Sequence, residues 1–421
     1  MRRKRQARPE EDNVTPPILI RNARQLLTLR GPKGARRGTE LNELSVIPNG
    51  AMLIRDGVIE EVGPAVRVEN LAAARGAVEI NAVGRIVMPG FVDSHTHLMF
   101  PPPCACGEAK REHESAVKVL LTMTGHRLER CGRGYLDAMA RHGTTTVEAK
   151  TGCGPHESAE TKVLRVLAAL HGKSLDVVAT LLLRFPRAEE GAPEADWAAA
   201  QWMWGELMPK IRRRRLARFA DLEWDPESWR QELFRRYLMA ARELGFECKV
   251  HADDAMPAAA VRLAVEHQAV SVDHLEHIGP EEVEALARSQ TVATLLPGAS
   301  FRRGKHAPAR ALIDAGAAVA IATNFNPCDT PSLNMQTAIS LACLAMGMSP
   351  AEAISAATVN GAHAIGCADR GLLAYGKRAD ILMLNVNDYR ELSQQLGTNL
   401  VHLTMIRGKV VYREGAVAEG I

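Results

Sequence analysis

The sequence predicts an α/β protein: a parallel (β/α)8 TIM-like barrel with a small β-sandwich domain formed by both chain ends. Between about residues 88 and 370, short apolar runs alternate with helical patterns, which is typical of parallel strands joined by crossover helices. The flanking segments hold short β-type runs separated by turn residues. A chain of 421 residues is long enough for both units. We therefore expect a composite domain over 17–87 and 371–421 and a barrel over 88–370.

The N-terminal segment is expected to begin with a disordered tail. Residues 1–16 are polar, charged and contain proline. An antiparallel unit follows, and Asp56-Gly57 is a strong hairpin signal between two of its runs. The expected strands of this unit are Ile18–Asn22, Ala51–Arg55, Val58–Val62 and Val78–Ile80.

The barrel segment offers eight strand candidates. The first is the apolar run from Arg85 that leads to His95, and the others are Thr144–Lys150, Asp176–Leu183, Phe219–Leu222, Phe246–His251, Ala269–His274, Thr291–Leu296 and Ala318–Asn324. The helical patterns are Ser115–Cys131, Arg133–His142, Ser158–His171, Asp225–Leu244, Met256–His267, Pro280–Ser289, Ala307–Ala315 and Ser349–Gly361. After the last helix, strand patterns return at Ile381–Val386 and Val401–Tyr412, and they are expected to complete the sheet begun by residues 18–83.

Composition excludes several classes of function. Hydrophobic residues make up 46% of the chain and charged residues 24%, which is the balance of a soluble globular enzyme. A net charge of +3 is too weak to favour nucleic acid. The basic clusters at residues 2–5 and 212–215 lack interleaved aromatic residues, so we interpret them as a frayed terminus and an exposed helix end.

No apolar run reaches the roughly 18 residues of a membrane span, and no apolar signal core follows the basic start. We therefore expect a cytoplasmic protein that does not bind a membrane. The eight cysteines have no repeated spacing, so a disulfide framework is not expected. Cys104-x-Cys106 is interpreted as loop cysteine, because zinc sites more often have two intervening residues.

The stretch from Met88 to His97, Met-Pro-Gly-Phe-Val-Asp-Ser-His-Thr-His, contains the central chemical signal. Residues i and i+2 of an extended chain project to the same side, so His95 and His97 are expected to point together. Two such imidazoles provide part of a catalytic metal site. Further polar residues, Lys150, His251, His274 and Asn324, lie at later predicted strand ends. In a barrel these ends meet at one face, where active sites are built.

Six segments resemble the imidazolonepropionase branch of the metal-dependent amidohydrolases, and the resemblance extends from about Ile18 to Tyr412. They are Met88–His97, Gly143–Gly152, Val250–Asp254, Asp273–Glu276, Leu295–Ala299 and Ala322–Pro327.

The resemblance implies one divalent ion, zinc or iron, held by His95, His97, His251 and the residue at position 324. It implies that His274 orients or polarises the scissile carbonyl, and that Asp254 positions the ring and the histidine. Arg111, Cys153 and Asn326 are the candidate substrate-binding residues. The implied reaction is the hydrolysis of a cyclic amide, 4-imidazolone-5-propanoate to N-formimidoyl-L-glutamate, in histidine degradation. The implied partner is a small molecule, and a homodimer is the candidate assembly.

The sequence departs from the family pattern at the site. Asn324 stands where the family has an aspartate, and an amide can coordinate a metal but cannot act as a general base. Asp329 lies five residues further on and could reach back. The loop after His97 lacks the usual Gly-Gly, so Lys110 or Arg111 is expected to bind the substrate carboxylate.

Three further positions differ in the substrate pocket. Cys153 replaces a tyrosine, residues 183–186 lack a histidine, and Asp254 is one methylene shorter than the family's residue. Two hypotheses follow: an active hydrolase, with the same or a changed cyclic amide substrate, or a weakly active or inactive scaffold.

Overall fold

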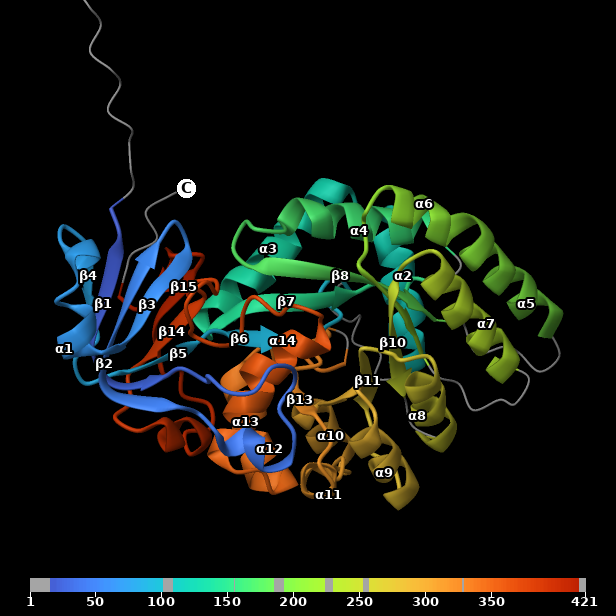
Figure 1. The fold of residues 1–421 in the computed structure, drawn as a ribbon. Helices are drawn as coiled ribbons and strands as arrows, with labels where there is room; N and C mark the ends of the chain where they lie inside the picture. The colour runs from blue at the N-terminus through green and yellow to red at the C-terminus, as the bar shows by residue number, and fades with distance from the viewer. Residues whose placement is uncertain are drawn as a thin grey trace, which may run out of the picture.

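The computed structural model describes residues 16–100, 109–154, 156–184, 193–223, 230–252, 257–327 and 329–415. It contains two sheets of eight strands each. One forms the barrel and the other lies at one end of the molecule (Figure 1). None of the helices in these ranges is long and apolar enough to cross a membrane.

The barrel sheet contains eight parallel strands in sequence order, as predicted. They are β6 Phe91–Asp93, β7 Thr144–Lys150, β8 Asp176–Leu183, β9 Phe219–Leu222, β10 Glu247–Ala252, β11 Ser271–His274, β12 Val292–Leu295 and β13 Val319–Ile321. Every neighbouring pair is parallel. The strand predictions between β7 and β13 agree with these bounds to within about three residues, because buried parallel strands give near-continuous apolar runs.

Contacts just beyond the strand ends close the barrel between β13 and β6. Thr96 and Phe325 form a parallel bridge, and the backbone N–H of His97 donates to the carbonyl of Phe325 at 2.8 Å. The buried carboxylate of Asp93 accepts from the backbone N–H of Thr323 at 3.0 Å and from its hydroxyl at 2.6 Å. The first and last barrel strands are therefore joined directly beside the His95–His97 segment.

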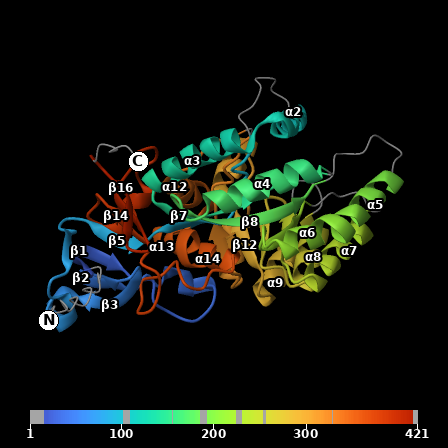
Figure 2. The same cartoon turned by 90° about the horizontal axis from the view of Figure 1, so that it is seen from above.

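Helices surround the barrel (Figures 1 and 2). They are α2 Ala109–Thr122, α3 Gly125–Arg141, α4 Glu157–Leu170, α5 Pro193–Trp202, α6 Met208–Arg213, α7 Arg230–Glu243, α8 Pro257–Glu266, α9 Pro280–Arg288, α10 Pro297–Arg303, α11 Ala309–Asp314, α12 Met335–Met346, α13 Pro350–Ser355 and α14 Gly361–Ala364. The predictions missed α5, α6, α10 and α12, and they placed a helix boundary at Cys131, which lies inside α3. The true break is at Met123–Thr124, where the Thr124 hydroxyl caps α3 by accepting from the backbone N–H of Arg127.

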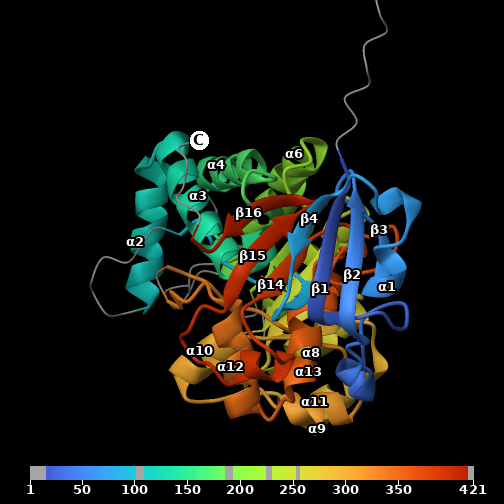
Figure 3. The same ribbon diagram turned by 90° about the vertical axis from the view of Figure 1, so that its left-hand side faces the viewer.

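The second sheet combines both chain ends, as predicted (Figure 3). Its strand order is β16-β15-β14-β5-β1-β2-β3, and β4 pairs with β1. The strands are β1 Ile18–Leu27, β2 Val46–Arg55, β3 Val58–Pro64, β4 Val78–Asn81, β5 Ile86–Pro89, β14 Ile381–Leu384, β15 Val401–Ile406 and β16 Lys409–Arg413. A short helix, α1 Ala65–Val68, follows β3.

Side chains from distant strands of this sheet share one hydrophobic cluster. Met52 and Ile54 of β2 and Ile59 of β3 belong to the same cluster as Leu403 and Met405 of β15. Since β3 is the last strand in the order and β15 is the second from the other end, the sheet curls so that its two halves face each other across a core. This is the sandwich-like domain that the sequence predicted.

One expectation near the first barrel strand was wrong. The run Ile86–Pro89 does not continue into the barrel but pairs with β1 and β14 of the second sheet. Gly90 separates it from β6, and a Cβ at this glycine would lie 2.1 Å from a side-chain carbon of Thr145. Only glycine fits where the chain passes this closely from one sheet to the other.

A cluster of arginines joins the two sheets around Asp176, the first residue of β8. Arg370 donates to its carboxylate at 2.8 Å, Arg407 lies 3.4 Å away, and Arg378 also bonds to it. Burial opposes ionisation, but these arginines outweigh it and lower the pKa of Asp176 to about 2. The second domain is thus held at the end of the barrel where β8 begins.

Candidate metal centre and active site

The His95–His97 segment extends directly beyond β6, and four imidazoles converge there. His95 and His97 come from this segment, His251 from β10, and His274 from the end of β11. The ring centroid of His95 lies 5.3 Å from that of His97 and 4.8 Å from that of His251. The ring centroid of His274 lies 4.5 Å from that of His251. All four side chains are buried.

The expected ligands differ in how closely the structure groups them. One ligand atom from each of His95, His251 and His274 lies within 4.8 Å of the others. The His97 ring lies 5.6 Å from that of His251 and is outside this group. Asn324 follows β13 with its backbone in the left-handed region at φ 54°, which asparagine and aspartate tolerate better than other non-glycine residues.

The protonation of these rings suits metal binding. Burial, followed by the charge of Lys150, lowers the pKa of His95 to about 3. Burial also holds the pKa values of His97 and His251 well below the usual value for histidine. These imidazoles are therefore neutral near pH 7, and a neutral imidazole has the lone pair that a metal needs.

Hydrogen bonding fixes which nitrogen of His95 faces the cluster. Its Nδ1 lies 2.8 Å from the carboxylate of Asp273, and Lys150, Lys249 and His95 hold the pKa of Asp273 low in spite of burial. The ionised carboxylate accepts from Nδ1–H, so Nε2 carries the lone pair. That buried Nε2 has no hydrogen-bond partner within the described ranges, and neither does the buried Oδ1 of Asn324.

These observations show that the residues present fit a divalent metal ion. Buried nitrogen and oxygen atoms without a partner are costly unless something binds them. Imidazole nitrogen with an oxygen ligand suits zinc, iron and related ions. Asp329 does not join this group among the residues that the structure describes. Its carboxylate bonds to Arg302 and accepts from the Thr330 hydroxyl at 3.0 Å.

A buried network of charges lies inside the barrel beside the histidines. Alternate residues of β7, β10 and β11 point inward, because a strand has a period of two. Lys150 contacts Asp221 at 2.5 Å, Asp273 at 3.0 Å and Glu148 at 3.4 Å. Lys249 contacts Glu148 at 2.6 Å. All five side chains are fully buried.

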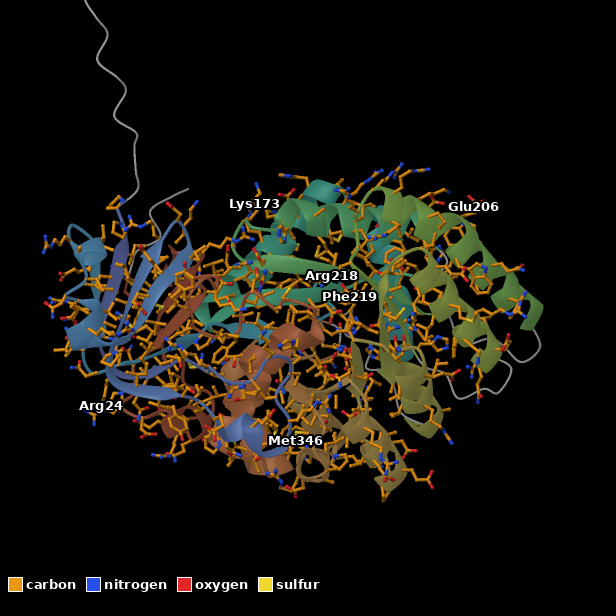
Figure 4. The ribbon with its side chains drawn as sticks, in the orientation of Figure 1. Arg24, Lys173, Glu206, Arg218, Phe219 and Met346 are labelled. Carbon is orange, nitrogen blue, oxygen red and sulfur yellow. The ribbon has the colours of Figure 1, made fainter. Side chains whose placement is uncertain are left out.

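This network explains Lys150. Burial alone would lower the pKa of Lys150, but Asp221, Asp273 and Glu148 raise it above the usual value. Its ammonium is therefore charged and forms structural ion pairs. The Lys249 ammonium lies over the ring of Phe219, 5.6 Å from its centroid. Phe219 is at the start of β9 and is labelled in Figure 4.

Among the predicted substrate-binding residues, Cys153 and Asn326 lie within the described ranges. Cys153 follows β7, its thiol is buried, and its backbone N–H donates to Glu160 at 2.7 Å. Burial and Glu160 raise the pKa of Cys153, so it stays a thiol. Asn326 follows β13, and its backbone N–H donates to the carbonyl of Thr330 at 2.9 Å. Arg111 lies in α2, but its side chain is outside the described residues, as are Asp254 and the Cys104–Cys106 pair.

Sequence reasoning missed an ion pair at the same end of the barrel. Arg184 directly follows β8 and forms an ion pair with Glu223. The backbone of Glu223 forms a parallel β-bridge with that of His251. The charge of Arg184 also contributes to the low pKa of His97, after burial and His95. The sequence signal was available, since a charged residue follows each of these two apolar strands.

Other sequence interpretations concern the surface and the thiols. Arg212–Arg215 are exposed at the end of α6, in agreement with the helix-end interpretation. Five cysteines fall within the described ranges, and all five are free.

Comparisons with known proteins identify the family. The Amidohydrolase family matches residues 101–412. A protein of Parabacteroides distasonis named imidazolonepropionase is 38% identical over 416 residues, covering 93% of this chain and 98% of its own. A protein of Geobacillus kaustophilus with the same name is 36% identical, and the match covers 95% of this chain and 99% of that protein. In fold, the chain resembles an atrazine chlorohydrolase of Arthrobacter aurescens complexed with zinc, with a TM-score of 0.73 and 18% identity. The match covers 96% of this chain and 97% of the chlorohydrolase chain. The chain therefore belongs to the amidohydrolase family, among the relatives of the imidazolonepropionases.

Proposed function

We propose that this protein is a metal-dependent hydrolase of a cyclic amide that opens 4-imidazolone-5-propanoate to N-formimidoyl-L-glutamate in histidine degradation. The observation that carries the proposal is the buried cluster of neutral imidazoles, with Asn324 beside it, at the carboxyl ends of the barrel strands. Relatives named imidazolonepropionase, similar over nearly the full length, support the substrate.

We place the metal site at His95, His97 and His251, with Asn324 at the fourth position that the family resemblance implies. A bound zinc or iron ion would lower the pKa of water and polarise the amide carbonyl. Asp273 holds the Nδ1–H of His95 and thereby keeps Nε2 directed at the ion. Asn324 can contribute an amide oxygen but cannot accept a proton from the attacking water.

The substrate would enter where Arg184 and Glu223 lie, at the ends of β8 and β9. Arg111, Cys153 and Asn326 remain the proposed substrate-binding residues, and Asp254 remains a proposed catalytic residue near the ring. The proposal also includes a cytoplasmic location, with a homodimer as the candidate assembly.

The direct test is turnover with a defined metal content. We expect protein loaded with zinc or iron to form N-formimidoyl-L-glutamate from imidazolonepropionate, and a chelator to abolish this activity. His95→Ala should remove both metal and activity, whereas the matched control His402→Ala, at a half-exposed position in the second domain, should retain them. Protein with one bound ion per chain and no turnover of this substrate would refute the proposal.

Asn324 favours a second candidate, a hydrolase with a different cyclic amide substrate or a weakly active scaffold. The Asn324→Asp substitution distinguishes these possibilities. If the position acts as the resemblance implies, a carboxylate there should tighten metal binding by about tenfold or more, because ligand charge tunes affinity, and should raise the rate of hydrolysis. No gain in either quantity would show that position 324 is not used in this way, and assays with other cyclic amides would then test for a changed substrate.

A further inference from the structure

His274 lies closer to the centre of the imidazole cluster than the resemblance to the family implies. Its ring centroid is 4.5 Å from that of His251 and 5.5 Å from that of His95. His97, an expected ligand, is 5.6 Å from His251. Ligand atoms of His95, His251 and His274 come within 4.8 Å of one another, and His251 also belongs to a second such group with Asp221 and Asp273. The fourth imidazole is thus placed as a ligand would be.

A carboxylate also lies on the Nδ1 side of His274, at a longer distance than the one hydrogen-bonded to His95. The Nδ1 of His274 is 3.6 Å from Oε2 of Glu276, and the Ser300 hydroxyl holds Glu276 by donating to its other oxygen at 2.7 Å. A carboxylate at one ring nitrogen is the usual companion of a metal-ligating histidine, because it directs the other nitrogen at the ion. His95 has this arrangement with Asp273 at 2.8 Å.

The backbone at this position is also unusual. His274 has φ 80° and Leu275 has φ 74°, so two consecutive non-glycine residues at the end of β11 lie in the left-handed region. Such conformations persist only where the surrounding structure holds them, and they gather at functional sites. Here the conformation lies where the chain leaves β11 and its last side chain enters the imidazole cluster.

We propose that His274 is a metal ligand in this chain, and that it takes the coordination position that Asn324 fills poorly. The ion would then be held by His95, His251 and His274, with His97 completing the set. This role replaces the carbonyl-polarising role that the resemblance implies for His274. The reason is chemical: an amide oxygen is a weak, uncharged ligand, whereas a neutral imidazole is a strong one.

Metal affinity provides the first test, and it does not depend on any substrate. The affinity of the full chain for Co²⁺ and Zn²⁺ would be measured by competition with a chelating dye. We expect His274→Gln to weaken binding by at least about tenfold, and Glu276→Gln by about tenfold, the effect typical of losing a partner behind a ligand. The control His267→Gln, at a buried histidine outside the cluster, should change affinity less than twofold.

The Asn324→Asp background separates a ligand from a residue that only supports the fold. If His274 compensates for the missing carboxylate, His274→Gln should cost less than about threefold in affinity once a carboxylate stands at position 324. An equal loss in both backgrounds would overturn the proposal, and so would unchanged affinity in the single variant.

Counting ligands in the unaltered protein avoids any dependence on the folding of variants. X-ray absorption at the zinc edge should report four imidazoles for the unaltered chain and three for Asn324→Asp. Three imidazoles in the unaltered protein, or no stoichiometric zinc, would overturn the assignment. A protein that binds zinc through four imidazoles but does not open imidazolonepropionate would leave this inference standing while refuting the proposed function.

Discussion

Replacing Lys150 by methionine tests whether the charges buried in the barrel stabilise the fold. The Lys150 side chain is fully buried, and its ammonium contacts three carboxylates at 2.5, 3.0 and 3.4 Å. Together with Lys249, the network has two positive and three negative groups, a formal charge of −1. The substitution makes this charge −2 inside the barrel, without altering the volume of the side chain greatly.

The expected loss follows from the cost of breaking a buried ion pair, about 3–5 kcal/mol. A chain of 421 residues has an unfolding entropy of about 0.9 kcal/mol per kelvin, at about 2.1 cal/mol/K per residue. The loss therefore corresponds to a fall in melting temperature of about 3–6 °C. A surface pair gives a contrasting scale, since exposed ion pairs contribute about 0–1 kcal/mol.

The assay is differential scanning calorimetry of the metal-free proteins at one matched scan rate, because a chain of this length can unfold irreversibly. The control is Lys210→Met, whose ammonium lies 3.3 Å from Glu157 on the surface, and it should lower the melting temperature by about 1 °C or less. If Lys150→Met melts within 1 °C of the unaltered protein, the network does not stabilise the fold as the contacts suggest.

Three further predictions concern the pH dependence of stability, the Asp273 carboxylate beside His95, and the bound metal ion. Arg378 and Arg370 outweigh burial and hold the pKa of Asp176 at about 2 in the folded protein, below the ordinary value of 3.8. This group should therefore contribute about 2 kcal/mol of stability above pH 4 that is lost as the pH falls towards 2, and thermal melts of Asp176→Asn should lack this dependence. Asp273→Asn should weaken zinc binding by about 10–100-fold, measured by dye competition, because His95 loses the acceptor that orients it. Zinc at a concentration of 100 Kd should stabilise the folded protein by about 2.7 kcal/mol. Removing the zinc with a chelator should therefore lower the melting temperature by about 3 °C, and an unchanged melting curve would argue against an ion bound to the folded state.

The barrel could be predicted from the sequence because its strands are buried on both faces. Apolar runs such as 176–183 have no other simple interpretation when helical patterns separate them. The helix α12, Met335–Met346, was missed because it is apolar on most of its surface and lacks a clear period. Ile86–Pro89 was assigned to the wrong sheet because an apolar run carries no information about which neighbours it pairs with.

The site was predictable in its histidines but not in the charges behind them. Strand ends converge in a barrel, so His95, His97, His251 and His274 could be brought together from their positions alone. The partners of Lys150 could not, because the sequence does not state which inward side chains meet at one level of the barrel. The pattern Glu-x-Lys in β7, Lys-x-His in β10 and Ser-x-Asp in β11 did signal polar inward faces, and a period of two with charged residues in a buried strand is the feature to look for.

The missing carboxylate at position 324 changes which groups control the ion. Imidazoles and an amide supply no negative charge to the metal, so the carboxylates close to the rings gain importance, among them Asp273 at 2.8 Å from His95 and Glu276 at 3.6 Å from His274. Asp273 is shared with Lys150 at 3.0 Å, which draws part of its charge away from the metal side. Glu276 lies 3.6 Å from His274 and accepts from the neutral hydroxyl of Ser300 at 2.7 Å, and no lysine or arginine forms an ion pair with it within the described ranges. Electrostatic support for a divalent ion should therefore depend more on Glu276 than the sequence pattern alone would indicate, and the strength of that support decides whether a site with Asn324 keeps its metal.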